Sequence, residues 1–301
     1  MAESTVPNAF VQAFRDAIVT LAQQKGSKLM KCVNVRDVTG KYDHFERIGA
    51  TEAQDVTSRH DNTPLIEVPH SRRRVILGTS NWATLLDKRD EVRMLIDPRN
   101  AYTIAGSYAM GRKQDDKILA ALTGNSTAVD SADAGSSIAL PAGNIIAKNY
   151  AFAGGGSDSN LTVEKIIRAR GIIEEYEVDV DDPSNMLFCA INAQGVQSLM
   201  NDAKYNNRDY GMPVLDGGMI KSFYGVNFVQ TERVLSDGSG NKLFPMWAKS
   251  GMGMSVATDM TVKIAERPDK NHAWQVYIEM DTGVVRVEEE KVVAITAAPL
   301  S

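Results

Sequence analysis

The stretch DPRNAYTIAGSYAMGRKQDDKILAALTG, residues 97–124, decides the fold of this 301-residue chain. Asp97 can cap a helix, Pro98 suits the first helical position, and Gly124 suits the end. About 26 helical residues at 1.5 Å each predict a rod of roughly 39 Å. The apolar stripe along this rod consists of Ala101, Ile104, Tyr108, Ile118 and Leu122.

The breaks in this stripe favour one kind of packing. Asp115 interrupts the stripe, and Gly106 and Gly111 weaken it. A free coiled coil needs a continuous apolar seam and would tolerate these breaks badly. A helix that lies across a sheet tolerates them, because glycine lets two backbones approach closely. We therefore predict that this helix crosses a sheet.

The composition is that of a globular chain, with 43% hydrophobic and 24% charged residues. The formal net charge is -5, so no overall basic field draws the protein to nucleic acid or to an anionic membrane. The sequence has no run of 18 apolar residues, so it predicts no transmembrane helix. Because MAESTVPNAF lacks a signal-peptide pattern, we expect the protein to stay where it is made.

The segments before the long helix predict two arms. Residues 7–24 form an amphipathic helical pattern whose apolar face needs a partner. Residues 29–78 carry short β-like runs, and Pro64 and Pro69 would restrict these to edge strands. This segment buries too little to be a domain, so we predict an extended hairpin arm. The apolar face of the first pattern consists of Phe10, Phe14, Ala17, Ile18 and Leu21.

The segments around and after the long helix alternate between loops, helices and strands. Residues 81–95 predict a helix or a mixed connector, and residues 125–160 a long loop that contains a short strand or hairpin. A second helix follows, with Asn160 or Ser159 as its cap. Its predicted inner face consists of Ile166, Ile167, Ile173 and Tyr176.

The chain is rich in strands from residue 186 onward. MLFCAIN predicts a buried strand, AQGVQSLMNDAK a short helix, and IKSFYGVNFVQTERV a strand pair around Gly225. DGSGN at 237–241 is typical of a hairpin turn. The last predicted strands are MTVKIAER, AWQVYIEMDTG and VVRVEEEKVVAITA.

No motif predicts catalytic, cofactor-binding or metal-binding residues. GGGSDSN at 154–160 precedes a helix, but it lacks the GK[ST] ending of a phosphate-binding loop. No GxSxG elbow is present. The acidic cluster Asp179, Asp181 and Asp182 has no EF-hand spacing and reads as a solvated turn. No metal-binding spacing links His44, His60, His70 and His272.

Two further residue groups have structural interpretations. Cys32 and Cys189 form no CxxC pair and predict buried thiols in a reducing compartment. Arg72, Arg73 and Arg74 form a basic run without interleaved aromatic residues. We expect this run to meet acidic neighbours and not phosphates, and the counterpart we propose is Glu288, Glu289 and Glu290.

The order of these elements resembles that of the major capsid proteins of tailed bacteriophages, which have the Hong Kong 97-type shell fold. The resemblance is most specific at WATLLDKRDEVRMLIDPRNAYTIAGSYAMGRKQDDKILAALTG (82–124) and GMPVLDGGMIKSFYGVNFVQTERV (211–234). It implies an α+β chain and a shell protein, not an enzyme. The implied parts are an N-terminal arm at 1–30, an extended loop at 31–80, a peripheral domain at 81–185 and 256–301 with the long helix as its spine, and an axial domain at 186–255.

The resemblance also implies partners and a location. Copies of the chain would form pentamers and hexamers in an icosahedral virion shell around double-stranded DNA, made in the host bacterial cytoplasm. We expect a portal, a separate scaffolding protein or none, and in some cases a decoration protein; DNA would lie near without specific contacts. The loop carries Lys41 but is otherwise rich in arginine, so no lysine–asparagine crosslink is predicted.

Alternative functions stay open at this point. Bacterial encapsulins share the shell fold but enclose cargo enzymes. A soluble nucleotide-binding enzyme that uses residues 154–160 belongs to another class, and monomers or small oligomers that bind a nucleotide would reveal it. A tube or decoration protein of the virion would form filaments or trimers.

Overall fold

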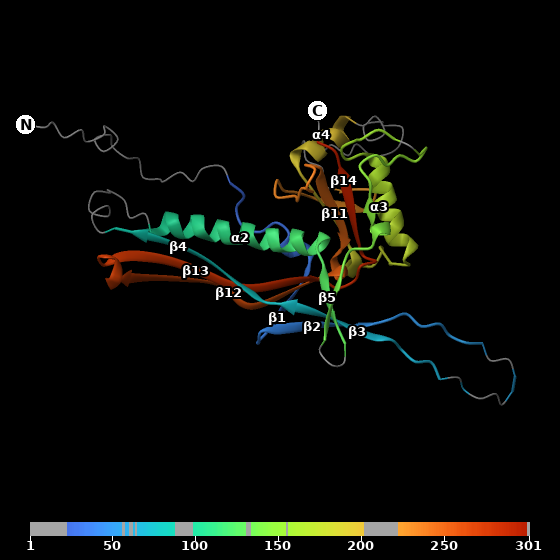
Figure 1. Ribbon diagram of the computed structural model, residues 1–301, viewed down its shortest axis with the longest axis horizontal. Coiled ribbons are helices and arrows are strands. Elements are labelled where there is room, and N and C mark those ends of the chain that lie inside the picture. The colour runs from blue at the N-terminus through green and yellow to red at the C-terminus, as the bar shows by residue number, and fades with distance from the viewer. Residues whose placement is uncertain are drawn as a thin grey trace, which may run out of the picture. The chain divides into compact units, whose positions relative to one another are not determined.

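The computed structural model describes residues 23–55, 58–59, 63, 65–87, 99–130, 134–154, 156–201 and 222–299 (Figure 1). The five apolar residues predicted for the helix at 7–24 lie outside the described residues, as do Asp97 and Pro98. The fold of the described chain is α+β, as predicted. None of its helices is long and apolar enough to cross a membrane.

The described residues form three α-helices and fourteen β-strands. The α-helices are α2 (Arg99–Thr123), α3 (Val163–Glu175) and α4 (Ala193–Asn201). The strands before α3 are β1 (Asn34–Asp37), β2 (Tyr42–Ile48), β3 (His70–Ile76), β4 (Gly78–Leu86), β5 (Ser126–Val129), β6 (Gly135–Ile138) and β7 (Ile145–Ile146). Those after it are β8 (Leu187–Ile191), β9 (Ser222–Phe223), β10 (Val226–Gln230), β11 (Lys242–Ala248), β12 (Met252–Arg267), β13 (Ala273–Arg286) and β14 (Val292–Ala297).

The described strands form three sheets. Their strand orders are β1-β12-β13-β4, β7-β14-β11-β8-β10-β9 and β2-β3-β5-β6. The chain divides into two compact units, and the division passes through α2, β12 and β13. The first unit holds the described parts of Met1–Ser27, Thr79–Lys113 and Thr258–Met280, and the second holds the remainder.

In the first unit, the N-terminal half of α2 lies along β4, β12 and β13 (Figure 1). Met110 packs with Val276, Ile278 and Met280. A Cβ atom at Gly106 would lie 2.6 Å from side-chain atoms of Ile278 and Trp82, so only glycine allows this approach. The prediction of a helix across a sheet with a glycine at the contact is therefore confirmed.

Details of the prediction for this region were wrong. Ile104, which the predicted apolar stripe included, is 38% exposed. Met110, which the stripe left out, is buried. Residues 81–86 continue strand β4 and are not helical. Alternating small, polar and apolar residues in GTSNWATLL suit a strand with one half-buried face, which the helical reading missed. Residues 88–95 lie outside the described residues.

The core of the second unit is built on the six-stranded sheet. Ile118, Leu119 and Leu122 of α2 join this core, together with side chains of α3, β8, β11 and β14. Trp247 is fully buried, and its Nε1 donates a hydrogen bond to the Cys32 carbonyl oxygen at 2.9 Å. Cys32 and Cys189 are both buried free thiols, and burial raises the pKa of Cys32 to about 11. Several predicted elements are confirmed here: the helix end at Gly124, the hairpin of β5 and β6, strand β8, helix α4, the β9–β10 pair and the turn at 237–241.

Asp115 has a structural role that its interruption of the stripe concealed. Its side chain is fully buried, and its carboxylate accepts hydrogen bonds from the backbone N–H groups of Lys28 (3.2 and 3.1 Å) and Leu29 (3.1 Å). Charge-assisted hydrogen bonds of this kind make a buried carboxylate favourable. Asp115 therefore fixes the segment that enters the core at Leu29.

Helix α3 begins later than the sequence suggested. Thr162 is its N-cap residue and makes no side-chain capping bond, so the predicted caps Asn160 and Ser159 were wrong. Ile166 and Ile173 are fully buried as predicted, and Ile167 is partly buried. Tyr176 is 46% exposed and lies beyond the inner face.

Lys165, in the first turns of α3, is fully buried. Its Nζ donates to the carbonyl oxygens of Lys148 (2.7 Å), Ser159 (2.8 Å), Asn160 (2.9 Å) and Thr296 (3.3 Å). Burial lowers the pKa of Lys165 to about 8. The ammonium group thus joins α3, the 148–160 loop and β14 through four carbonyl groups.

Replacement of Lys165 tests this contact. We expect Lys165→Met to lower the free energy of unfolding by about 3 kcal/mol, because buried carbonyl groups lose their donor. Urea unfolding at pH 7 measures the effect, and Lys113→Met, at an exposed position of α2, is the matched control. Equal urea midpoints for the two variants would contradict the assigned role.

Candidate functional site: the hairpin arm and its buried anchor

The most distinctive feature of the second unit is the hairpin of β2 and β3. The two strands pair antiparallel from Tyr42↔Ile76 to Ile48↔His70, and Gly49 N–H donates to Pro69 at 2.8 Å. Beyond this bond the loop continues away from the paired strands (Figure 1). The predicted extended hairpin is therefore confirmed. The edge-strand expectation was wrong for β3, because β3 also pairs with β5.

The two faces of this hairpin differ, as the twofold alternation of strands requires. On one face Phe45 and Val75 are buried and pack with Val285 and Val287. On the other face Tyr42, Ile48 and Ile76 are 42%, 71% and 60% exposed. The hairpin therefore offers apolar surface that the described part of its own subunit leaves open.

The loop beyond the strands carries further exposed apolar residues. Leu65 is 97% exposed, and Ile66 and Val68 are each 43% exposed. Isolated exposed apolar residues are ordinary, but several that occur together in one loop mark a candidate interaction surface. We call Tyr42, Ile48, Leu65, Ile66, Val68 and Ile76 the hairpin surface.

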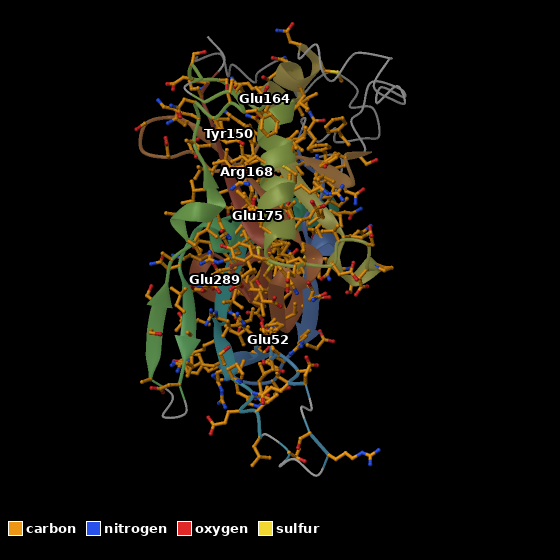
Figure 2. All side chains as sticks on the ribbon, turned by 90° about the vertical axis from the view of Figure 1, so that its right-hand side faces the viewer. Glu52, Tyr150, Glu164, Arg168, Glu175 and Glu289 are labelled. Atoms are coloured by element: carbon orange, nitrogen blue, oxygen red, sulfur yellow. The ribbon has the colours of Figure 1, made fainter. Side chains whose placement is uncertain are left out.

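The base of the hairpin is held by Glu289, which is 5% exposed. Its Oε2 accepts hydrogen bonds from Arg73 Nη2 (2.7 Å) and Arg47 Nη1 (3.1 Å), and its Oε1 accepts one from Ser126 Oγ (3.1 Å). Arg286 Nε lies 3.8 Å from Oε1. In Figure 2, Glu289 lies below the end of α3 and above Glu52 of the hairpin loop. One carboxylate therefore connects β2, β3, β5 and β13.

Arg286, fully buried, extends this network to the end of α2. Its Nη1 donates to the carbonyl oxygens of Leu122 (3.2 Å) and Gly124 (2.6 Å), and its Nη2 donates to Ile138 (3.1 Å). A cation at a helix C-terminus satisfies carbonyl groups that have no partner in the helix. Burial lowers the pKa of Arg286, and the charge of Glu289 opposes that shift.

The balance of effects on Glu289 favours its ionised form. Burial alone would raise the pKa of this carboxyl, but the hydrogen bond and charge of Arg73 and the hydrogen bond of Ser126 lower it further than burial raises it. Glu289 is thus a carboxylate at neutral pH. We call Glu289, Arg73, Arg47, Arg286 and Ser126 the buried anchor.

The expected meeting of the arginine run with the glutamate run is confirmed at one pair, Arg73 and Glu289. Arg72 is exposed, because neighbouring residues of a strand point to opposite faces. The glutamates lie in a turn between β13 and β14 and not within the single predicted strand. Sequence reasoning missed Arg47, Ser126 and Arg286. An arginine inside the apolar alternation of GVVRV was the available signal for Arg286.

The other chemical candidates do not gather into a reactive site. The 154–160 loop turns the carbonyl oxygens of Ser159 and Asn160 toward Lys165, an arrangement that suits a cation and not a phosphate. Among the described residues, no three His, Cys, Asp or Glu side chains are grouped to hold a metal ion. Asp182 accepts hydrogen bonds from Ser184 N and Oγ and so caps the start of the short 3-10 helix Pro183–Asn185, as expected of a solvated acidic loop.

A groove of about 600 Å³ lies beside the buried anchor. Its lining has no serine, cysteine or histidine. Five carboxylates and two cations make it acidic. These charged lining residues are Glu46, Glu177, Asp179, Glu288, Glu290, Arg47 and Lys291.

Comparisons with known proteins identify the family to which the chain belongs. A family model described as "Phage capsid protein" matches residues 6–298. The capsid of Ralstonia phage GP4 matches at a TM-score of 0.71 and 12% identity, covering 96% of both chains. The capsid of cyanophage P-SCSP1u gives 0.70 and 15%, with 97% of this chain and 94% of that chain covered. The head of Helicobacter pylori bacteriophage KHP40 gives 0.69 and 10%, with 98% of both covered. No curated protein sequence matches significantly.

Removal of the charge on Glu289 tests the buried anchor. We expect Glu289→Gln to lower the free energy of unfolding by about 3 kcal/mol at pH 7, because Arg73 and Arg286 then lie buried without their counter-charge. The pKa of Glu289 is lowered in the folded state. The stabilisation is therefore complete above the ordinary glutamate pKa of about 4.3 and is lost as the pH falls below it.

Urea unfolding at pH 7, 5 and 4 measures this dependence. Glu290→Gln is the matched control: its side chain is 42% exposed and 3.7 Å from Arg47, so we expect a loss below about 1 kcal/mol. If the two variants lost the same stability at pH 7, the anchor would not depend on Glu289.

Proposed function

The chain belongs to the phage capsid protein family and is a major capsid protein that forms the head shell, and from this premise we propose how it does so. Each copy is a tile of an icosahedral shell around the double-stranded DNA of a tailed phage. Copies assemble into pentamers and hexamers. The hairpin surface of one copy lies on a neighbouring copy.

The observation that carries this proposal is the hairpin surface. Leu65, Ile66 and Val68 are apolar and exposed at a loop that is held away from its own core by the buried anchor. Apolar area that one subunit leaves open is stabilised when a second subunit covers it. Contacts in which different surfaces of identical copies meet can close into rings, and rings can close into a shell.

The proposed parts follow the domain boundaries that we expect from the sequence. Residues 1–30 form an N-terminal arm and 31–80 an extended loop; 81–185 with 256–301 form a peripheral domain, and 186–255 an axial domain. Helix α2 would then stiffen the tile as its spine. Its 25 residues at 1.5 Å each correspond to roughly 38 Å.

The proposed partners are those of a phage head. A separate scaffolding protein and a portal would act in assembly in the host bacterial cytoplasm, and a decoration protein could cover the finished shell. DNA would lie near the inner surface without specific contacts. The net charge of -5 supports this view, because such a chain has no overall attraction for phosphate.

Negative-stain electron microscopy of the purified full chain, combined with light scattering, tests the proposal. We expect closed shells or rings of five and six. A stable monomer of 32.8 kDa that fails to assemble with crowding agents or with scaffolding protein would contradict it.

Replacement of Leu65 tests the role of the hairpin surface. Leu65 is 97% exposed, so Leu65→Ser should leave the urea midpoint of the isolated subunit unchanged. Because the apolar contact with the neighbour is lost, we expect the subunit concentration required for shells to rise at least about tenfold. Thr51→Ser, at another exposed position of the same loop, is the control. Normal assembly of Leu65→Ser would show that the loop does not contact a neighbour.

A further inference from the structure

A two-residue turn joins β9 and β10, and its first residue is Tyr224. Ser222 pairs with Asn227 and Phe223 with Val226, so only Tyr224 and Gly225 lie between the paired strands. Both have positive φ, 50° for Tyr224 and 72° for Gly225. This is the backbone of a type I′ hairpin turn, in which asparagine, aspartate or glycine is usual at the first position.

Tyrosine at this position is unfavourable for the subunit alone. A side chain with a Cβ atom is strained in the left-handed region, and a bulky one is unusual there. The side chain is also 49% exposed, so burial does not compensate fully for this strain. The neighbouring Phe223 packs partly against the core, and the centre of its ring lies 6.5 Å from that of Tyr224.

Arg170 of α3 holds Tyr224 in this conformation. Its guanidinium carbon lies 4.5 Å from the centre of the tyrosine ring, and its Nη1 donates to the Tyr224 carbonyl oxygen at 2.5 Å. Its Nε donates to Glu174 Oε1 at 2.6 Å, which fixes the guanidinium itself. A Cβ atom at Gly225 would lie 2.6 Å from Arg170 Nη1, so the second turn residue is restricted as well.

Arg170 and Phe223 therefore both lie beside the tyrosine ring, and Tyr224 is still 49% exposed. A residue kept in a strained backbone conformation by its surroundings points to a function for which the strain is retained. Exposed tyrosines next to arginines are typical of the residues that dominate protein interfaces. A tyrosine whose rotamers are already restricted also loses little entropy when a partner covers it.

We propose that Tyr224, held by Arg170, is a preformed contact to a second copy of this chain in the assembled shell. The proposal rests on the shell function above, which requires identical copies to meet through several separate surfaces. It also lies outside the hairpin surface, so the two contacts can be tested independently. The exposed part of the ring would pack against apolar or cationic groups of the neighbour.

Tyr224→Gly separates the effect of the tyrosine on the stability of the subunit from its effect on assembly. Glycine relieves the positive φ, so the urea midpoint of the unassembled subunit should stay within error or rise. If the ring contacts a neighbour, the subunit concentration required for shells should increase at least about tenfold. Tyr224→Asn tolerates the same backbone but lacks the ring, and it should show the same assembly defect even if the glycine variant folds poorly.

Two controls sharpen the measurement. Tyr224→Phe retains the ring and should assemble at wild-type concentrations. Asn271→Gly, at a position with φ of 50° where asparagine is ordinary, should change neither assembly nor stability by much.

The outcomes are distinguishable by light scattering and negative-stain microscopy of purified full chains. Loss of shells in Tyr224→Gly and Tyr224→Asn with normal subunit folding supports the proposal. If both variants form shells at wild-type concentrations, the proposed contact is wrong and the shell function stands. The same conclusion follows if a defect appears only when another virion protein is added. Failure of the wild-type chain to form any shell, with or without scaffolding protein, overturns the shell function itself and this contact with it.

Discussion

The carboxylate of Glu289 is the interaction on which the hairpin depends. The hairpin has little core of its own, and β2 is the edge strand of the four-stranded sheet that it forms with β5 and β6. Here Phe45 and Val75 supply a small apolar contact, and Glu289 adds charge-assisted bonds to Arg47 on one strand and Arg73 on the other. A buried carboxylate is costly unless its partners are in place, so the anchor forms only when both strands are correctly seated.

This form of attachment suits a segment that must reach outward. Directional bonds at the base fix the direction in which the strands leave the subunit, and the apolar surface beyond them stays open. Specificity of orientation is the better-supported use of buried ion pairs, since a well-packed apolar substitute can be equally stable.

Sequence reasoning found the elements whose information is local. Period-two alternation and turn residues predicted the β2–β3 hairpin and the β9–β10 pair, and a capped apolar pattern predicted α2. The Arg73–Glu289 pair was the one long-range polar contact that it found. It missed the partners of two other buried charges: Asp115 binds residue 28, 87 positions away, and Lys165 binds Thr296, 131 positions away. Asp115 stood out only as a break in the apolar stripe, and nothing near Lys165 distinguishes it from a solvent-facing charge, so only the fold reveals their partners.

Strain and exposed apolar area are both unfavourable for the isolated subunit, and both occur here at defined places. Tyr224 has a backbone that glycine would adopt more easily, and Leu65 has almost its whole side chain in water. Native proteins are stable by a narrow margin, so a subunit with several such features gives up a measurable part of that margin. The contacts that we propose with neighbouring copies would recover this stability. For a shell built from many copies, this arrangement makes the subunit more stable in the closed assembly than when it is free.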